Sequence, residues 1–126
     1  MLKITKPMQP IGYMLYSPVK NYCYGSLYVQ PIHDIFKDYS LQKGSDQFSK
    51  EMTGRVDYWL RTDCPEKHAE ISSEILTWFE KSWKGKYVFT ARAEMKSRIR
   101  NYVALGLREI AVLKSNTGES VLFIYQ

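Results

Sequence analysis

Two strand–turn–strand patterns, one toward each end of the sequence, limit most strongly what this chain can fold into. Residues 11–17 (IGYMLYS) and 21–30 (NYCYGSLYVQ) are rich in β-branched and aromatic residues, and the turn SPVKN joins them. Residues 108–126 hold two further apolar runs on either side of the turn sequence SNTG. Such runs, separated by short turns, are typical of β-hairpins. We therefore expect a mainly antiparallel sheet that receives one hairpin from each of these regions.

The segment 63–83 predicts the first of two long helices. Asp63 takes the N-cap position, Pro65 lies in the first turn and Glu66 completes a capping box, which is a strong signal for a helix start. Gly85 marks the end of the helix. Apolar residues recur at helical intervals along one face, which comprises Ile71, Ile75, Trp78 and Phe79. We expect Ile75 and Phe79 to belong to the core.

A second long helix is expected from about Ala91 to Leu105, with Thr90 as its cap and Gly106 as its stop. Its apolar face consists of Met95, Ile99, Tyr102 and Val103, and we expect Met95, Ile99 and Val103 in the core. The remaining elements are a short helix at 31–39, a long exposed loop at 40–54, and strands at 55–61 and 86–89.

The order of the predicted elements is β-β-α-β-α-β-α-β-β. Hairpins near both ends and amphipathic helices between them favour an α+β fold, in which helices pack on one face of a mainly antiparallel sheet. At 126 residues, the chain is expected to form a single two-layer domain, residues 1–126.

Few residues offer catalytic or metal-binding chemistry. The cysteines and histidines are Cys23, His33, Cys64 and His68, which could form a zinc set but lack compact CxxC spacing. Cys64 at the start of a helix, with His68 as a base, is an alternative nucleophilic site. Glu66, Glu70 and Glu74 form an i, i+4 row, which is more typical of a solvated helix face. No glycine-rich phosphate-binding motif occurs, and we expect neither a metal nor a cofactor.

The location expected from the sequence is the cytoplasm. Two cysteines make no disulfide framework, and reduced thiols are usual for cytosolic proteins. No apolar run has the length of a signal peptide or approaches the roughly 18 residues of a membrane span.

Positive charge is concentrated in residues 81–110. This stretch holds eight basic and two acidic residues, a net charge of +6 in a chain whose total is +5. Aromatic residues are interleaved with the basic ones, a combination that favours binding to phosphates and bases. An acidic protein surface would fit equally well, and a solvated border of a buried helix face is the simpler alternative. The candidate binding residues are Lys84, Lys86, Arg92, Lys96, Arg98, Arg100, Arg108 and Tyr87.

The first hairpin is rich in tyrosine. In its second strand, Tyr22, Tyr24 and Tyr28 share one parity and so should project from one face of the sheet. That face is a candidate stacking platform, although cross-strand packing explains the tyrosines without any ligand.

One resemblance to a known family rests on the segment Tyr102–Leu107 (YVALGL), which is followed by two strands. It resembles the C-terminal YxxxGF segment of acetyltransferases of the GNAT type. That family binds the pyrophosphate of acetyl-CoA with a Q/R-x-x-G-x-G/A turn before a helix, and YVFTARAEMK, which leads into the expected second helix, has no glycine. The sequence alone therefore assigns no family.

These patterns favour a small, non-catalytic protein that engages nucleic acid through the basic face at residues 81–108. An accessory protein of the phage or mobile-element type, which docks on a host protein and inhibits it, is the alternative. A small enzyme with a thiol or carboxylate site is the third interpretation.

Overall fold

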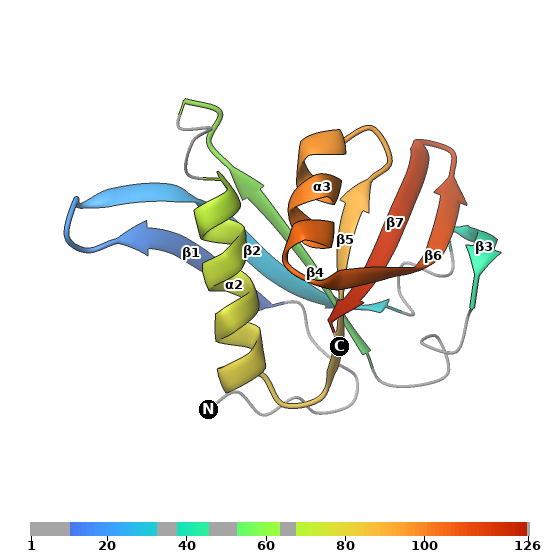
Figure 1. Cartoon of the computed structure of the whole chain (residues 1–126), viewed down its shortest axis with the longest axis horizontal. Coiled ribbons are helices and arrows are strands. Elements are labelled where there is room, and N and C mark those ends of the chain that lie inside the picture. Colours follow the sequence, from blue (N-terminus) through green and yellow to red (C-terminus); the bar gives the residue numbers. More distant parts are fainter. Residues whose placement is uncertain (1–10, 33–37, 46–52, 64–67, 126) are drawn as a thin grey trace.

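The computed structural model describes residues 11–32, 38–45, 53–63 and 68–125 of the chain (Figure 1). The elements in chain order are β1 (Ile11–Ser17), β2 (Tyr22–Pro31), β3 (Ser40–Gly44), β4 (Thr53–Leu60), α2 (His68–Ser82), β5 (Lys86–Arg92), α3 (Lys96–Ala104), β6 (Leu107–Ser115) and β7 (Gly118–Tyr125).

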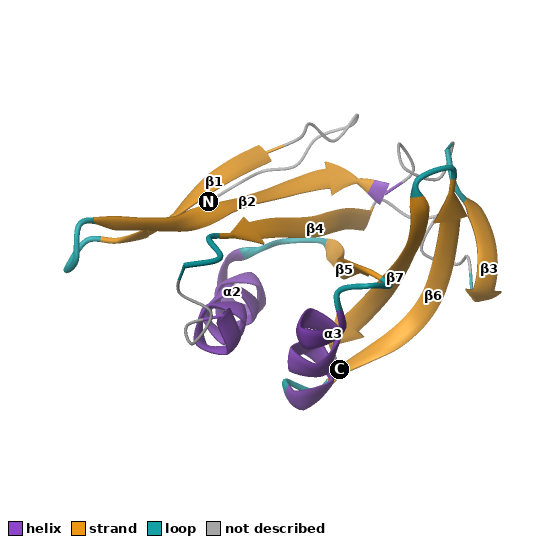
Figure 2. Ribbon diagram, turned by 90° about the horizontal axis from the view of Figure 1, so that it is seen from above, coloured by secondary structure: helices purple, strands orange, loops and turns teal. Residues whose placement is uncertain are grey.

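The seven strands form one sheet in the order β1-β2-β4-β5-β7-β6-β3. Strands β4 and β5 pair in parallel, and each of the other neighbouring pairs is antiparallel. Figure 2 shows α2 and α3 on the same face of this sheet. The predicted fold class is confirmed: a mainly antiparallel sheet carries the helices on one face.

Both predicted hairpins are present. β1 pairs with β2 from Ile11↔Val29 to Ser17↔Tyr22. β6 pairs with β7 as far as Ser115↔Gly118, which leaves two residues in the turn. These elements depend on local alternation and turn residues, which is why their boundaries are close to those expected.

Helix α2 packs through the apolar face that its periodicity predicts. Ile75 and Phe79 of α2 are buried, and the ring of Phe79 lies 5.6 Å from that of Phe89 on β5. Of the residues predicted to cap this helix, Pro65 and Glu66 lie outside the described part of the chain. Asp63 itself lies in a turn, where its carboxylate accepts hydrogen bonds from Arg61 and from the hydroxyl of Tyr22.

The second helix starts later than expected. Ala91 and Arg92 extend β5 because they pair with Val121 and Ser120 of β7, so Thr90 is a buried strand residue and not a helix cap. Long-range pairing here overrides the local helical pattern. Val103 on α3 is 61% exposed, so its placement in the core was wrong.

Residues 40–44 are also different from the prediction. They form strand β3, which pairs with β6 at one edge of the sheet, where the sequence suggested an exposed loop. The short helix expected at 31–39 falls largely on 33–37, outside the described residues.

A β-bulge overturns the predicted tyrosine platform. The register shifts so that Leu15 pairs with Gly25 but Tyr16 pairs with Cys23, which leaves Tyr24 as the extra residue. An inserted residue reverses the parity of the side chains. Tyr24 therefore lines a cavity on the helix side, whereas Tyr28 lines a shallow hollow that Trp59 also borders.

The sheet has apolar residues on both faces. The larger core lies beneath the helices and includes Tyr58, Phe79, Phe89 and Tyr102. A smaller core on the other face comprises Ile32, Val88, Ala111, Leu113 and Leu122. None of the helices in the described segments is long and apolar enough to cross a membrane.

Candidate active site at the gap between β4 and β5

The parallel strands β4 and β5 separate after a short pairing. Their register runs from Thr53↔Lys86 to Val56↔Phe89. Beyond that point, β4 continues alongside β2, while residues 90–92 of β5 pair with β7. We call this point of separation, between residues 57–60 of β4 and residues 90–92 of β5, the β4–β5 gap.

Backbone groups of β4 point into this gap. The N–H of Arg61 donates to the carbonyl of Tyr24 on β2 at 2.8 Å, and successive residues of a strand direct their backbone groups to alternate sides. The N–H and C=O of Tyr58 therefore point toward the β5 side. A strand that loses its neighbour leaves such groups in need of other partners.

Side chains supply those partners. The hydroxyl of Thr90 donates to the carbonyl of Val56 at 3.2 Å. Arg98, which reaches in from α3, donates from Nη1 to the carbonyl of Tyr58 at 2.7 Å. The N–H of Tyr58 donates to the carboxylate of Asp57 at 2.9 Å. Side chains thus replace the ladder of backbone hydrogen bonds where the strands diverge.

Arg98 is the most constrained charged residue at the gap. Its side chain is 11% exposed, and its guanidinium carbon lies 4.0 Å from the centroid of the Tyr58 ring. Nη1 also lies 3.9 Å from Oδ1 of Asp57. Because Asp57 follows the opposite parity from Tyr58 on β4, it belongs to the face away from the helices. The guanidinium therefore sits at the level of the sheet itself.

Asp57 is shared between two arginines. Its Oδ2 lies 3.2 Å from Nη2 of Arg55 and 3.3 Å from the hydroxyl of Tyr28, which donates to it. The carboxylate raises the pKa of Tyr28, in addition to the larger effect of burial. One carboxylate thus faces two guanidinium groups at this site.

Tyr102 lies beneath the gap. Its side chain is fully buried, and its hydroxyl donates to the carbonyl of Thr90 at 3.1 Å. Burial raises the pKa of Tyr102 well above its ordinary value, so the phenol stays protonated at neutral pH. Nearby, the hydroxyl groups of Tyr58 and Ser72 are 2.7 Å apart.

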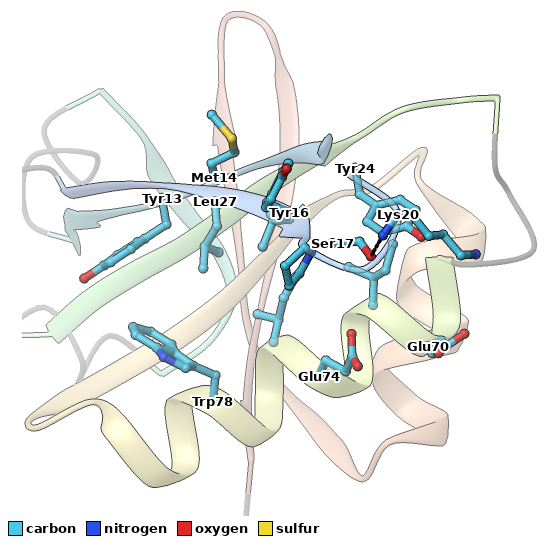
Figure 3. Close-up of a pocket in the computed structure, with 14 residues that line it drawn as sticks. Tyr13, Met14, Tyr16, Ser17, Lys20, Tyr24, Leu27, Glu70, Glu74 and Trp78 are labelled. Carbon is cyan, nitrogen blue, oxygen red and sulfur yellow. Dashed lines mark hydrogen bonds between the residues drawn. The ribbon is translucent and has the colours of Figure 1, made fainter. Parts of the chain in front are cut away.

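A separate cavity of about 660 Å³ lies between the first hairpin and α2 (Figure 3). Tyr13, Leu27 and Trp78 line it together with Ile71 and Ile75 of α2. Figure 3 also shows Glu70 and Glu74 projecting from α2 toward the hairpin. Ser72, whose hydroxyl contacts that of Tyr58, is not among the residues that line this cavity.

The basic residues predicted to form a stripe lie on several elements and differ in exposure. Lys86 and Arg92 begin and end β5, which places them about 20 Å apart along an extended strand. Lys84, Lys96, Arg100 and Arg108 are exposed, whereas Arg98 points inward. Arg92 pairs with Glu94 and donates to the carbonyl of Thr117, and the half-buried Tyr87 donates to Glu80.

The thiol and imidazole candidates are partly outside the described residues, which exclude His33 and Cys64. The thiol of Cys23 is free and lies 3.4 Å from the carbonyl of Gly25. Nε2 of His68 lies 2.8 Å from the carbonyl of Arg61. The described segments contain no group of three or more residues placed to hold a metal ion.

Comparison with known proteins finds similarity in structure but not in sequence. No protein-family model matches the sequence, and no curated protein matches it. A GnaT-family acetyltransferase from Bordetella pertussis superposes with a TM-score of 0.62 at 14% identity, covering 91% of this chain and 65% of that one. A spermidine N-acetyltransferase SpeG variant from Vibrio cholerae gives a TM-score of 0.57 at 10% identity, covering 90% and 63%.

Arabidopsis thaliana NAA60, solved with a bisubstrate analogue, gives a TM-score of 0.53 at 14% identity over 86% of this chain and 68% of that one. The chain thus spans less than two thirds of the length of the Bordetella and Vibrio proteins. At these identities the similarity establishes the fold, which is the α+β fold of GNAT acetyltransferases.

This fold corrects the functional interpretation of the sequence. The matched structures are acetyltransferases, which overturns both the non-catalytic nucleic-acid-binding protein and the phage-type inhibitor of a host protein. The preference for a protein without catalytic activity was wrong, as were nucleic acid and an acidic protein surface as partners. Two of the basic residues on which that interpretation rested have partners within the protein, since Arg92 pairs with Glu94 and Arg98 with Asp57.

The structure also relocates the comparison with the GNAT motif. The helix that follows the parallel strand β4 is α2, so the segment to compare with the phosphate-binding turn is 61–67 (RTDCPEK) and not YVFTARAEMK. That segment has no glycine either. Tyr102 and Gly106, in contrast, do occupy the end of a helix before two strands, as the resemblance implied.

Proposed function

We propose that this chain is an acyltransferase of the GNAT type that moves an acyl group from a thioester to an amine. The observation that carries the proposal is the separation of the parallel strands β4 and β5 within a chain whose fold matches acetyltransferases over about nine tenths of its length.

The reaction requires little of the protein beyond placement. The amine nitrogen attacks the thioester carbonyl, so that a C–N bond forms and the C–S bond breaks. The nitrogen loses a proton, and the departing thiolate takes one up. Holding both reactants in contact supplies much of the rate enhancement in such a step. The amine class of acceptor is suggested by the spermidine N-acetyltransferase among the matched structures.

The gap does not fit an acetyl thioester as it stands. The C=O of Tyr58 is taken by Arg98, and its N–H is taken by Asp57. The segment 61–67 also lacks the glycines that let a backbone approach a pyrophosphate. An acyl donor must therefore bind through contacts other than the usual phosphate turn. It must either displace Arg98 from the carbonyl of Tyr58 or bind to Arg98 itself.

The test is a binding and turnover experiment with the intact chain. Acetyl-CoA, succinyl-CoA and free coenzyme A are titrated by calorimetry, and thiol release is followed with spermidine and with a short peptide as acceptors. We expect saturable binding of at least one thioester and thiol release that depends on the amine. Absence of binding by every thioester, or thiol release that does not depend on the amine, would overturn the proposal.

A further inference from the structure

We infer that the cavity between the first hairpin and α2 is a binding site for an amine that carries an aromatic or other apolar body, such as an arylalkylamine. This cavity is separate from the β4–β5 gap, and the inference does not depend on the proposed acyltransferase function. It follows from the size of the cavity, from the arrangement of its walls and from the charge that they carry.

The cavity has the size and the walls of a small-molecule site. Its volume of about 660 Å³ lies within the range of roughly 300–1,000 Å³ that is usual for such sites. Leu27 of β2 and Ile75 of α2, each 4% exposed, form part of its apolar wall. The rings of Tyr13 and Trp78, whose centroids are 5.2 Å apart, stand at one end of it (Figure 3).

One row of side chains on α2 divides the cavity into an acidic and an aromatic part. Glu70, Glu74 and Trp78 are spaced four residues apart, so they lie on the same face of the helix, and all three line the cavity. Figure 3 shows Glu74 between Trp78 and Glu70 along this row. A ligand that lies along the row therefore meets an aromatic ring at one end and carboxylates beyond it.

The charge of the cavity favours a cation. The carboxylates of Glu70 and Glu74 line it against one basic side chain among the described residues, that of Lys20. This excess of acid contrasts with the net charge of +5 of the whole chain. Like charges four residues apart on a helix repel each other, and the side chain of Glu74 forms no hydrogen bond or ion pair within the described residues. An ammonium group beside Glu74 relieves this repulsion.

The aromatic part of the cavity suits the same ligand. Tryptophan offers a large apolar surface, and its ring attracts cations. The ring of an arylalkylamine can pack against Leu27, Ile75 and Trp78, while its ammonium group meets Glu74, one helical turn or about 5.4 Å further along α2. A carboxylic acid of the same shape would instead bring its charge against two carboxylates. The cavity thus selects for a positive charge and an apolar body together.

The experiment titrates three probes into the intact chain by calorimetry. Phenethylamine has a ring and an ammonium group, ethylamine has only the ammonium group, and 3-phenylpropanoate carries the same ring on a carboxylate. We expect one saturable site for phenethylamine. Each of the other two probes should bind at least roughly tenfold more weakly, because ethylamine buries no ring and 3-phenylpropanoate has the wrong charge.

Variants locate the bound amine. The double variant Glu70→Gln/Glu74→Gln should weaken phenethylamine binding by roughly 3- to 20-fold, since exposed ion pairs contribute modestly, and it should not weaken the binding of 3-phenylpropanoate. Glu74→Gln alone should give a smaller loss, and it serves if the double variant does not fold. The control is Glu119→Gln, which removes an exposed carboxylate of β7 that does not line the cavity. It should stay within about twofold of the wild type.

Three results would overturn the inference: no saturable binding of phenethylamine, equal binding of the three probes, or a double variant that binds phenethylamine as the wild type does. Equal losses in the double variant and in Glu119→Gln would also overturn it, because the overall charge of the chain, and not the cavity, would then attract the amine. None of these titrations involves a thioester, so the proposed acyltransferase function is tested separately.

Discussion

The two edges of strand β4 are held in different ways, and the contrast shows which of them depends on side chains. On the β2 side, seven consecutive residues pair through the backbone ladder, from Gly54 to Leu60. On the β5 side, four residues pair, and side chains complete the hydrogen bonding beyond them. A backbone ladder is fixed by the fold, whereas a side chain can rotate away. Hydrogen bonding along the β5 edge therefore depends on the side-chain conformations of Thr90 and Arg98.

The strongest test of the β2 edge is Gly25→Ala. A Cβ on Gly25 would lie 1.8 Å from the carbonyl oxygen of Trp59 on β4, so the strands would have to separate. We expect the free energy of unfolding to fall by at least about 4 kcal/mol, or the protein not to fold, because the overlap is with backbone. Urea denaturation measures the change.

Gly12→Ala is the matched control for this substitution. Gly12 lies on β1, and a Cβ there would meet nothing within 4 Å. A change within about 0.5 kcal/mol is expected for it. If Gly25→Ala were as mild as Gly12→Ala, the close approach of β2 and β4 would be wrong.

A smaller loss is expected at the β5 edge from Thr90→Val. This substitution keeps the shape of a 2% exposed side chain but removes the hydroxyl that donates to the carbonyl of Val56. We expect a loss of about 1–3 kcal/mol, the cost of leaving a buried acceptor without its partner. Thr77→Val, which removes a solvent-facing hydroxyl bonded to its own helix, should cost less than about 0.5 kcal/mol. Equal losses in the two variants would show that the Thr90 hydrogen bond does not hold the strands together.

The smallest effect is expected where β4 ends, at Asp63, and it depends on pH. The hydrogen bond from Arg61, and to a lesser degree that from Tyr22, holds the pKa of Asp63 below its ordinary value of 3.8. A carboxyl group whose pKa is lowered by folding stabilises the protein above its unfolded pKa, and this contribution disappears as the pH falls through the folded value. Asp63→Asn should therefore be slightly less stable than the wild type near neutral pH and equal to it in strong acid.

Urea denaturation of the wild type and of Asp63→Asn, from neutral pH to strong acid, measures this difference in stability. Tyr22→Phe removes only one of the donors, so it should lose a smaller part of the pH dependence. A difference between wild type and Asp63→Asn that does not change with pH would contradict the role of the carboxylate.

The sequence allowed the elements set by local patterns to be predicted. The hairpins β1–β2 and β6–β7 follow from alternation and turn residues, and the buried face of α2 follows from helical spacing. The late start of α3 and the existence of β3 could not be predicted in this way. Both depend on pairing with β7 and β6, which are distant in sequence. The bulge at Tyr24 likewise appears only in the pairing of β1 with β2, and Gly25 beside it lies close to the backbone of Trp59.

The sequence pattern did not indicate the β4–β5 gap, but the position of Arg98 in its helix was a usable signal. Arg98 was grouped with the exposed basic residues, although it precedes Tyr102 by four positions, and residues four apart lie on the same helix face. Tyr102 was expected on the apolar face and is fully buried. A charged residue on the buried face of a helix is a signal for an internal ion pair or a ligand site. That Asp57 lies near both Arg55 and Arg98 could be seen only in the three-dimensional structure.

Strand β3 has a consequence for the order in which the molecule assembles. It lies between β2 and β4 in the sequence, yet it pairs with β6 at the far edge of the sheet, and the hydroxyl of Ser40 bonds to a carbonyl 74 residues away. Contacts between residues so distant along the chain form slowly because a long loop must close first. Residues 40–44 can pair only after the strands of the hairpin β6–β7 are in place. Their backbone amides should accordingly gain protection from hydrogen exchange late in folding and lose it early when the protein opens.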